Sequence, residues 1–389
     1  MHDNDQGGYA MQNVKARVLA LYLPQFHPIP ENDEWWGKGF TEWTNVGKAK
    51  RYFPGHYQPR VPADLGYYDL RVPETREAQA NLAREYGIEG FVYWHYWFGN
   101  GKQLLERPFN EVLASGKPDF PFCLGWANES WHGFWHGVKT EKPLIEQKYP
   151  GEEDYIAHFK AVLPAFRDRR YIRCKGKPVF FIYKHEQLPD AGEFVSLWQK
   201  LAKENNLPGI YFITHVQNVL SKEWGEKIIG DVKSMGFDAV NVLNLLCGMA
   251  MPFWLKAIRK ALLNRFVLRY HLIPDIRYYC KENLRSPVDD NEFVIPSVAP
   301  GWDHTPRTGN KGILLVGSTP EKFQKITEEQ VAKIQYKPFE ERFLVVKSWN
   351  EWAEGNYLEP DLKYGHQYLQ ALRNAVMLHT DDNSAKLES

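Results

Sequence analysis

Short runs of consecutive apolar, β-branched or aromatic residues recur along the chain, and each run predicts a strand. The runs are continuously apolar rather than alternately apolar and polar, which is typical of strands buried on both faces of a parallel sheet. Eight such strands are predicted: Arg17–Leu23, Gly90–Tyr96, Phe122–Trp126, Val179–Tyr183, Ile210–Thr214, Ala239–Val242, Phe293–Val298 and Phe343–Lys347.

Amphipathic segments lie between these runs and predict helices. Residues 73–86 begin with proline, carry apolar residues at helical spacing and are followed by Gly87, a residue that often ends a helix. Residues 318 to about 334 begin with Ser318 and have Glu321 three residues on, which is the spacing of a capping box. Two further amphipathic stretches contain Leu197–Leu201 and Tyr368–Leu378.

Strands alternating with helices over 389 residues predict an α/β fold, a (β/α)8 TIM barrel with extended βα-loop insertions. A doubly wound open sheet is the alternative, because the pattern alone does not show closure. No GxGxxG follows the first strand, which argues against the dinucleotide-binding form of that alternative. A single domain is expected over residues 14–380, with insertions at about 24–70 and 243–290. Residues 1–13 are expected to be a disordered leader and 381–389 a C-terminal tail.

Charge and cysteine usage narrow the classes of partner. The chain has 48 basic and 48 acidic residues, which argues against a nucleic-acid partner held by a global positive field. Four scattered cysteines form no CxxC or Cys/His cluster, so no metal site is expected.

The sequence also predicts where the protein works. Residues 1–13 lack the apolar core of a signal peptide and no run approaches 18 apolar residues, so we expect a cytoplasmic protein without a transmembrane segment. The basic, apolar stretch 254–283 predicts either peripheral contact with an anionic membrane or insertion helices that pack on the barrel with a solvated basic face.

Aromatic residues make up 15% of the chain, an excess that fills a core or lines a cleft that stacks sugar rings. In a barrel of this class the active site is built from the segments that follow the strands. Here those segments are rich in Trp, His, Asn and carboxylates. We therefore expect an oligosaccharide or polysaccharide substrate.

Glu351 and Glu354 follow the last predicted strand and are three residues apart. If the chain enters a helical turn there, the two carboxylates project from the same side. Two carboxylates close together in a partly dry cleft have separated pKa values, and one of them can stay protonated near neutral pH. That division into acid and base is what glycosidic bond cleavage needs. The alternative is an ordinary solvated pair.

Other polar and aromatic residues in or directly after the strands are candidates for substrate binding. The aromatic candidates have the alternative of filling the barrel, and the histidines that of being hydrogen-bonded core residues. For Asp303 and Arg307 the alternative is a structural ion pair with each other. Glu42 is expected to have a structural role. The candidates are Tyr22, His27, His95, Trp97, Trp126, Asn128, Glu129, Trp302, Asp303, Arg307 and Asn350.

Six segments together resemble a known family. They run in order from residue 21 to residue 355 and so cover nearly the whole chain. The segments are LYLPQFHP (21–28), WWGKGFTEWTNV (35–46), YWHYWF (93–98), WANESW (126–131), PGWDHTPR (300–307) and NEWAEG (350–355). They resemble the family 99 glycoside hydrolases, the endo-α-mannosidase group, and more closely the WbsX-like proteins of bacterial polysaccharide loci.

The resemblance implies a (β/α)8 barrel with retaining action on α-mannoside-like linkages. The implied mechanism needs no metal and no organic cofactor. By this resemblance Glu351 acts as base on the 2-hydroxyl of the sugar, which attacks the anomeric carbon to form a 1,2-anhydro intermediate. Glu354 acts as general acid and then as general base. Ala353 stands where the hydrolase motif usually has His, which implies that a polar contact near the donor sugar is missing.

Two other functions fit the same sequence. The first is a glycosyltransferase or transglycosidase of capsule or O-antigen assembly, although no DxD motif is placed to hold a metal and a nucleotide sugar. The second is a non-catalytic sugar-binding protein, against which the presence of both Glu351 and Glu354 argues.

Overall fold

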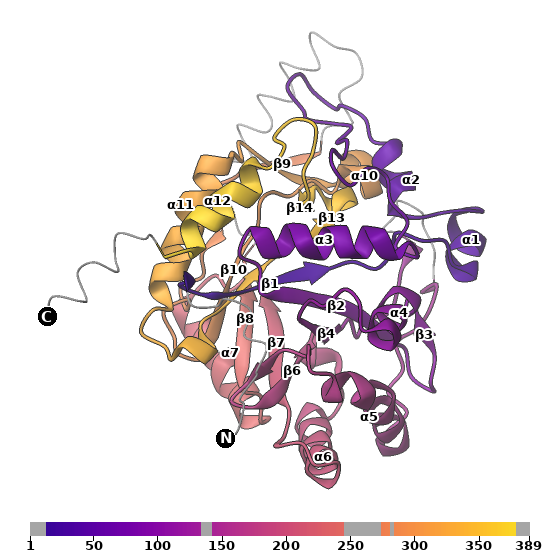
Figure 1. The fold of residues 1–389 in the computed structure, drawn as a ribbon, viewed down its shortest axis with the longest axis vertical. Helices are drawn as coiled ribbons and strands as arrows, with labels where there is room; N and C mark the ends of the chain where they lie inside the picture. The colour runs from indigo at the N-terminus through magenta and orange to yellow at the C-terminus, as the bar shows by residue number, and fades with distance from the viewer. Residues whose placement is uncertain (1–12, 134–141, 245–273, 281–283, 379–389) are drawn as a thin grey trace, which may run out of the picture.

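Eight parallel strands form a closed barrel in the computed structural model, which describes residues 13–133, 142–244, 274–280 and 284–378 (Figure 1). β1 is hydrogen-bonded to β2 on one side and to β12 on the other, so the sheet has no free edge. The predicted barrel is therefore confirmed, and the open-sheet alternative is wrong. The strands in barrel order are β1 (Arg17–Tyr22), β2 (Gly90–Trp97), β4 (Phe122–Trp126), β6 (Lys177–Ile182), β7 (Tyr211–Gln217), β8 (Ala239–Leu243), β10 (Val294–Val298) and β12 (Phe343–Val346).

Helices surround the barrel because each connection between parallel strands must cross back along the outside. The longer ones in the described part of the chain are α3 (Pro73–Glu85), α4 (Arg107–Ser115), α5 (Glu152–Arg167), α6 (Ala191–Glu204), α7 (Lys222–Ser234), α11 (Pro320–Lys333) and α12 (Gln367–Val376). Short helices and 3-10 turns are α1 (Pro30–Trp36), α2 (Glu42–Gly47), α10 (Thr305–Thr308), η3 (His185–Gln187), η4 (Gly309–Lys311), η5 (Phe339–Glu341) and η6 (Trp352–Glu354). Short strands outside the barrel are β3 (Gln103–Leu104), β5 (Arg173–Cys174), β9 (Asp275–Tyr278), β11 (Ile313–Val316), β13 (Asn350–Glu351) and β14 (Asn356–Tyr357).

The start of α11 differs from the predicted capping box. The N-cap is Thr319, whose Oγ1 accepts a hydrogen bond from the backbone N–H of Lys322 at 3.3 Å, and Pro320 takes the first helical position. Ser318 lies one residue outside the helix and bonds instead to the carbonyl oxygen of Pro300 and the hydroxyl of Tyr368. The prediction was therefore one residue early, because the fixed φ of proline sets where this helix begins.

The register of the strands decides which side chains enter the barrel. Trp94 of β2 is paired with Gly125 of β4, and the ring of Trp94 reaches His215 of β7 across the interior, with 5.8 Å between ring centroids. Since neighbours at one level of the sheet share a face, alternate residues of each strand line the interior. Polar groups lie inside as well: Asn241 of β8 donates a hydrogen bond to the Ser297 hydroxyl of β10 at 2.8 Å.

The longest described connection, between β1 and α3, covers one end of the barrel. It contains α1 and α2, and α2 packs against α10 and η6 on the side where the strands end (Figure 1, top). Of the second predicted insertion, 243–290, the described part contains β9, which pairs with β11. Residues 1–12 of the predicted leader 1–13, the predicted tail 381–389 and most of the basic stretch 254–283 lie outside the described residues.

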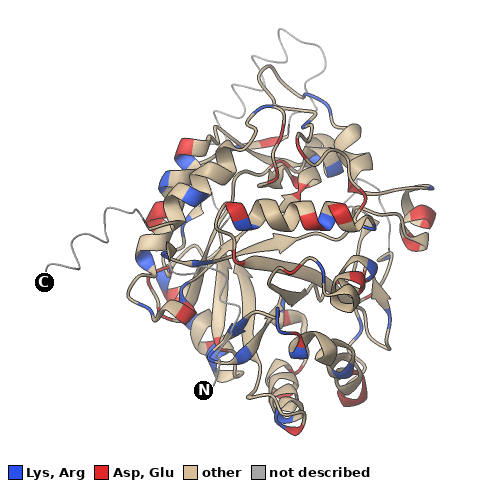
Figure 2. Cartoon of the chain, viewed as in Figure 1, with Lys and Arg blue, Asp and Glu red and all other residues tan. Residues whose placement is uncertain are grey.

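Acidic and basic residues alternate along the outer helices in the view of Figure 2. Among the helices of the described ranges, none combines the length and the apolar character that a bilayer crossing requires.

Candidate active site

A cleft of about 440 Å³ opens at the carboxyl ends of the strands. Its walls come from the segments at the ends of β1, β2, β4, β6, β10 and β12, which is where a barrel of this class builds its active site. Six aromatic side chains line it: Trp36, Trp94, Tyr96, Trp131, Tyr183 and Trp302. Charged side chains in the walls are Glu129, Lys184, Arg307, Lys311, Lys347, Glu351 and Glu354.

The aromatic walls are held by edge-to-face ring contacts. Trp94 meets Tyr183 at 5.5 Å between ring centroids, and Tyr96 meets Trp131 at 5.1 Å, both nearly perpendicular. Such pairs fix ring orientation because the positive edge of one ring faces the negative face of the other. The cleft therefore offers rigid flat surfaces beside its carboxylates.

The turn that carries the two glutamates is anchored at both ends. Asn350 is fully buried, and its side-chain amide bonds to the N–H and the carbonyl oxygen of Leu23, at 2.8 and 3.0 Å, which ties the turn to the end of β1. Trp352 stacks on Tyr357 with 3.8 Å between ring centroids and donates its indole N–H to Glu359 at 2.6 Å. Between these anchors, η6 turns Glu351 and Glu354 toward the cleft.

One guanidinium group joins both glutamates. Arg307 of α10 donates from Nη1 to Glu354 at 2.5 Å and from Nη2 to Glu351 at 3.1 Å. Its Nε donates to Glu42 of α2 at 3.2 Å. Lys347, at the end of β12, lies 3.5 Å from the other oxygen of Glu354. The structure thus brings together the predicted residues Glu351, Glu354 and Arg307.

The surroundings separate the pKa values of the two glutamates. Burial and the negative charge of Glu354 raise the pKa of Glu351. Burial alone would also raise the pKa of Glu354, but Lys347, Arg307 and His304 outweigh it and hold this pKa below its usual value. In the free protein the pair therefore keeps a proton on Glu351 to higher pH than on Glu354.

Another buried carboxylate supports the turn from behind. Glu359 accepts hydrogen bonds from the Tyr68 hydroxyl at 2.9 Å, from the Gln79 amide at 2.6 Å and from Trp352. Burial raises the pKa of Glu359 to about 7 in spite of these donors. Sequence reasoning missed this residue, because two of its three partners, Tyr68 and Gln79, are far from it in the sequence.

We expect Glu359 to make folding stability depend on pH. Because the folded state raises this pKa above the unfolded value, the contribution of Glu359 is fully present below about pH 4.5 and is lost as the pH rises through about 7. Glu359→Gln removes this titration. The stability of the parent relative to the variant should therefore fall by about 2 kcal/mol between pH 5 and pH 8. Urea unfolding of both proteins at the two pH values measures this, and an equal difference at both would contradict it.

Three of the predicted substrate-binding residues line the cleft: Glu129, Trp302 and Arg307. Glu129 forms an ion pair with Lys184 at 2.5 Å. Trp302 lies under the ammonium group of Lys347, 5.4 Å from the ring centroid. Asn350 lies behind the cleft and acts as the anchor described above.

His95, Trp97 and Trp126 point away from the cleft, toward α5. His95 lies 2.9 Å from His158 of α5, nitrogen to nitrogen, and burial lowers its pKa to about 4. Trp97 stacks on His158 and donates to Asp154, while Trp126 donates to the carbonyl oxygen of Trp97. Successive side chains of a strand point to opposite faces, so Trp94 and Tyr96 of β2 are the residues that point inward and line the cleft. His95 and Trp97 of β2 and Trp126 of β4 therefore lie on the outward faces of their strands, away from the cleft.

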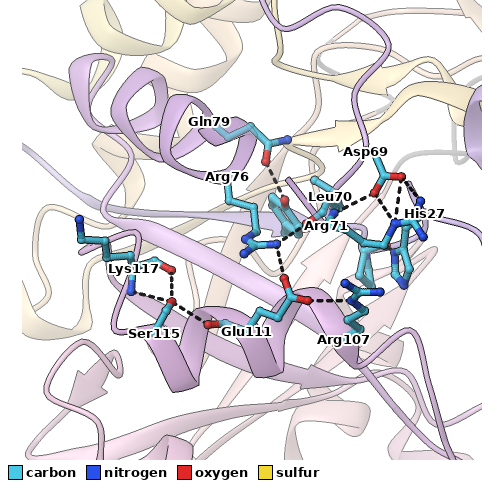
Figure 3. Close-up of polar contacts among 12 residues, drawn as sticks. His27, Asp69, Leu70, Arg71, Arg76, Gln79, Arg107, Glu111, Ser115 and Lys117 are labelled. Atoms are coloured by element: carbon cyan, nitrogen blue, oxygen red, sulfur yellow. Dashed lines mark hydrogen bonds and ion pairs between the residues drawn. The ribbon is translucent and has the colours of Figure 1, made fainter. Parts of the chain in front are cut away.

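Tyr22 and His27 are buried on the α3 side of the barrel. The hydroxyl of Tyr22 donates to Gln79 of α3 at 2.7 Å, so Tyr22 packs outside β1 and does not face the cleft. His27 lies 3.0 Å from the carbonyl oxygen of Pro24 and beside Asp69 and Arg71 (Figure 3). His27 is therefore a buried, hydrogen-bonded residue, whereas Tyr22 neither lines the cleft nor fills the barrel interior and packs against α3 instead.

Asn128 and Asp303 fix loops rather than line the cleft. The amide of Asn128 bonds to the backbone N–H and carbonyl oxygen of Lys184, both at 2.8 Å, which joins the segments after β4 and β6. Asp303 is 1% exposed and accepts hydrogen bonds from Gln58 at 2.8 Å and from the Thr305 hydroxyl at 2.6 Å, with His56 also 2.8 Å away. Arg307 pairs with three glutamates rather than with Asp303.

Ala353 is fully buried and packs in the core behind the turn. Ala353 does not line the cleft, and the absence of a polar contact near the sugar stays a prediction. A larger residue there changes the packing of η6.

Sequence reasoning missed several residues of the cleft walls. Lys347 had a usable signal, since it is a lone charge that ends an apolar run of the strand pattern. Trp94 and Tyr183 had none, because a tryptophan or tyrosine in an apolar run reads equally as core. Within the described residues, no three His, Cys, Asp or Glu side chains are grouped so as to hold a metal ion.

Comparisons with known proteins agree with this geometry. A family model described as glycosyltransferase WbsX matches residues 18–372. Proteins called "uncharacterized protein WxcX" from two strains of Xanthomonas campestris pv. campestris are 37% identical over 368 residues, which is 94% of this chain. The chain spans about half the length of these relatives, 50% of each.

Solved structures share the fold. A glycoside hydrolase-like protein has a TM-score of 0.56 at 16% identity, with 94% of each chain covered. The GH99 endo-α-mannosidase from Bacteroides thetaiotaomicron, in complex with bis-tris-propane, has a TM-score of 0.53 at 14% identity, covering 96% of this chain and 99% of that one. At these identities the likeness is one of fold.

Proposed function

Because the chain belongs to the WbsX family, a family of carbohydrate-active enzymes with a GH99-like barrel, we propose that it is a retaining glycoside hydrolase that cleaves an α-linked, mannose-like glycan. The observation that carries this proposal is the pair Glu351 and Glu354, joined by Arg307 and facing an aromatic-lined cleft. Flat rings stack on sugars, while the two carboxylates supply an acid and a base.

The proposed reaction uses the 2-hydroxyl of the substrate. One carboxylate takes the proton of that hydroxyl while the 2-oxygen of the sugar attacks the anomeric carbon. The other carboxyl group donates a proton to the departing glycosidic oxygen. A 1,2-anhydro sugar results. Water, deprotonated by the second carboxylate, then opens the strained ring at the anomeric carbon, and the first carboxylate returns its proton to the 2-oxygen. Two displacements retain the configuration.

The two roles are assigned by the resemblance to Glu351 as base and Glu354 as acid. In the free protein the neighbouring cations favour the opposite arrangement, with the proton on Glu351. The proposed roles therefore require sugar binding to move the proton to Glu354, and a leaving-group test described in the Discussion assigns them.

Product analysis tests the hydrolase proposal. The protein is incubated with α-linked mannans and with bacterial capsule and O-antigen polysaccharides, and release of reducing ends is measured. Cleavage with retention is the expected result, and loss of cleavage on the 2-O-methyl ether of the sugar that is cut supports attack by the 2-oxygen. Cleavage of that ether at the parent rate contradicts the 1,2-anhydro route.

Glycosyl transfer is the second candidate, and the description of the family model favours it. A transferase should be stabilised thermally by a nucleotide sugar or its nucleoside diphosphate, and it should extend a lipid-linked acceptor. A transglycosidase should use the same carboxylates and give a glycosylated acceptor instead of a free reducing end.

A further inference from the structure

Glu42 is a fully buried carboxylate that the proposed chemistry does not use. It is the first residue of α2, in the segment between β1 and α3, and its side chain is 0% exposed. One of its oxygens accepts the Nε–H of Arg307 at 3.2 Å. The other oxygen has no hydrogen-bond partner among the described residues. Burial of a carboxylate is costly, and two cations compensate it: Arg307 through this contact and Lys48, just after α2, through its charge.

Arg307 is shared in a definite geometry. A guanidinium is planar, and its five N–H bonds point outward in fixed directions. Nε is bound to Glu42, Nη1 to Glu354 and Nη2 to Glu351, so all three nitrogens have a carboxylate partner. A contact at Nε fixes the plane of the group, and this plane decides where both terminal nitrogens point.

We propose that Glu42 is a positioning residue, which holds Arg307 so that one cation reaches both Glu351 and Glu354 and which offsets the charge of that cation. The proposal deepens the proposed function and rests on it only for the view that the glutamate pair is the reacting pair. Glu42 acts through Arg307, and the cleft walls do not include it.

Formal charges explain why the third carboxylate matters. Glu42, Glu351 and Glu354 carry three negative charges when ionised, against two positive charges on Arg307 and Lys347. One proton on the pair therefore makes this buried group neutral. Arg307 and Lys347 both contact Glu354, whereas Glu351 has only the longer contact with Arg307, so the proton belongs on Glu351.

The other titratable groups that face the pair come from separate elements. Tyr96 of β2 and Tyr183 after β6 contribute hydroxyls, and His304, just before α10, contributes an imidazole. Burial raises the pKa of both tyrosines and lowers that of His304, so all three are neutral near pH 7. Near pH 7 the charges that change the titration of the pair are therefore those of Glu42, Arg307 and Lys347, and His304 adds a positive charge only at lower pH, where its imidazole is protonated.

Without the negative charge of Glu42, the positive charge of Arg307 is balanced only by Glu351 and Glu354. Glu42→Gln keeps the size of the side chain, but the group of charges is then neutral without a proton. We expect the pKa of Glu351 to fall by roughly 1 to 2 pH units, the usual effect of one close charge.

Carboxyl carbon NMR on the full chain with labelled glutamate measures this without any assay of activity. Glu351→Gln and Glu354→Gln assign the two signals, which are then titrated in the parent, in Glu42→Gln and in Glu42→Asp. The Gln variant should titrate at lower pH, and the Asp variant, which keeps the charge, should stay near the parent. Glu31→Gln is the control, because Glu31 is also a helix glutamate in an ion pair, with Lys102, and does not line the cleft.

A Glu351 titration that Glu42→Gln leaves unchanged, or that Glu31→Gln shifts equally, overturns the proposal. If Glu42→Gln does not fold, Arg307→Lys with Glu42 intact tests the same geometry, since an ammonium group lacks the planar fork. The separation between the two glutamate titrations should then shrink, and an unchanged separation overturns the proposal. These measurements do not depend on a substrate, so absence of glycan cleavage would refute the proposed function and leave the role of Glu42 to its own test.

Discussion

Glu351→Gln and Glu354→Gln are each expected to lower kcat on the glycan that the parent cleaves by about 10²- to 10⁴-fold, the usual contribution of a general acid or base. Each amide keeps the shape of the side chain and can still accept a hydrogen bond from Arg307 but cannot exchange a proton. The loss should appear in kcat more than in KM, because the aromatic walls that hold the sugar are unchanged. Initial rates by reducing-end release measure both constants.

A change of leaving group separates the two roles. The leaving group of an aryl glycoside made from an acidic phenol departs as a phenolate and needs no proton. The variant that lacks the acid should therefore regain most of the rate of the first step on such a substrate. The variant that lacks the base should stay slow on both substrates. Recovery in Glu354→Gln supports the roles implied by the resemblance, and recovery in Glu351→Gln supports those favoured by the ion pairs. Full activity of either variant on the natural glycan contradicts the proposed chemistry, with Glu31→Gln as the control.

Arg307→Leu is expected to lower the free energy of unfolding at pH 8 by about 3 to 5 kcal/mol, the usual cost of leaving a buried charge without its partner. The variant leaves three buried carboxylates around a single remaining cation, Lys347. Their pKa values should rise in the folded state, so the stability that they contribute is lost as the pH increases above about 4.5. The deficit against the parent should therefore be smaller at pH 5 than at pH 8.

Urea unfolding at the two pH values, followed by circular dichroism, tests this expectation. Arg307→Lys keeps the charge and loses the planar fork, so it should fall between the parent and Arg307→Leu. A deficit of equal size at both pH values would mean that Arg307 stabilises the fold by packing rather than by its charge.

Much of the fold could be predicted because its elements have local causes. A barrel strand is covered by helices on one side and by the filled interior on the other, so its sequence is continuously apolar, and all eight strands were visible for that reason. The glutamate turn was found by the same logic, since it follows the last strand. Where a local rule depended on one residue, as at Ser318 and Thr319, the neighbouring proline decided the outcome.

The identity of the cleft residues was harder to predict, because it depends on which face of each strand points inward. In YWHYWF the residues at 94 and 96 line the cleft, whereas those at 95 and 97 contact α5. A continuously apolar strand carries no alternation that would distinguish the two sets. The partners that reveal the faces, His158 for His95 and Gly125 for Trp94, come from later segments and are defined only by register.

Gly125 of β4 has no side chain, and the space beside it is filled by the ring of Trp94 from β2, which lines the cleft. A β-carbon built at this position would lie 3.2 Å from the Trp94 ring and 3.1 Å from Val92, so the indole occupies space that any other residue on β4 would claim. The depth of the cleft is therefore adjustable by paired exchange: a larger side chain at 125 requires a smaller ring at 94. Relatives that act on sugars of different bulk are expected to differ at these two positions together, and libraries that vary them jointly should alter substrate range where single changes only disturb packing.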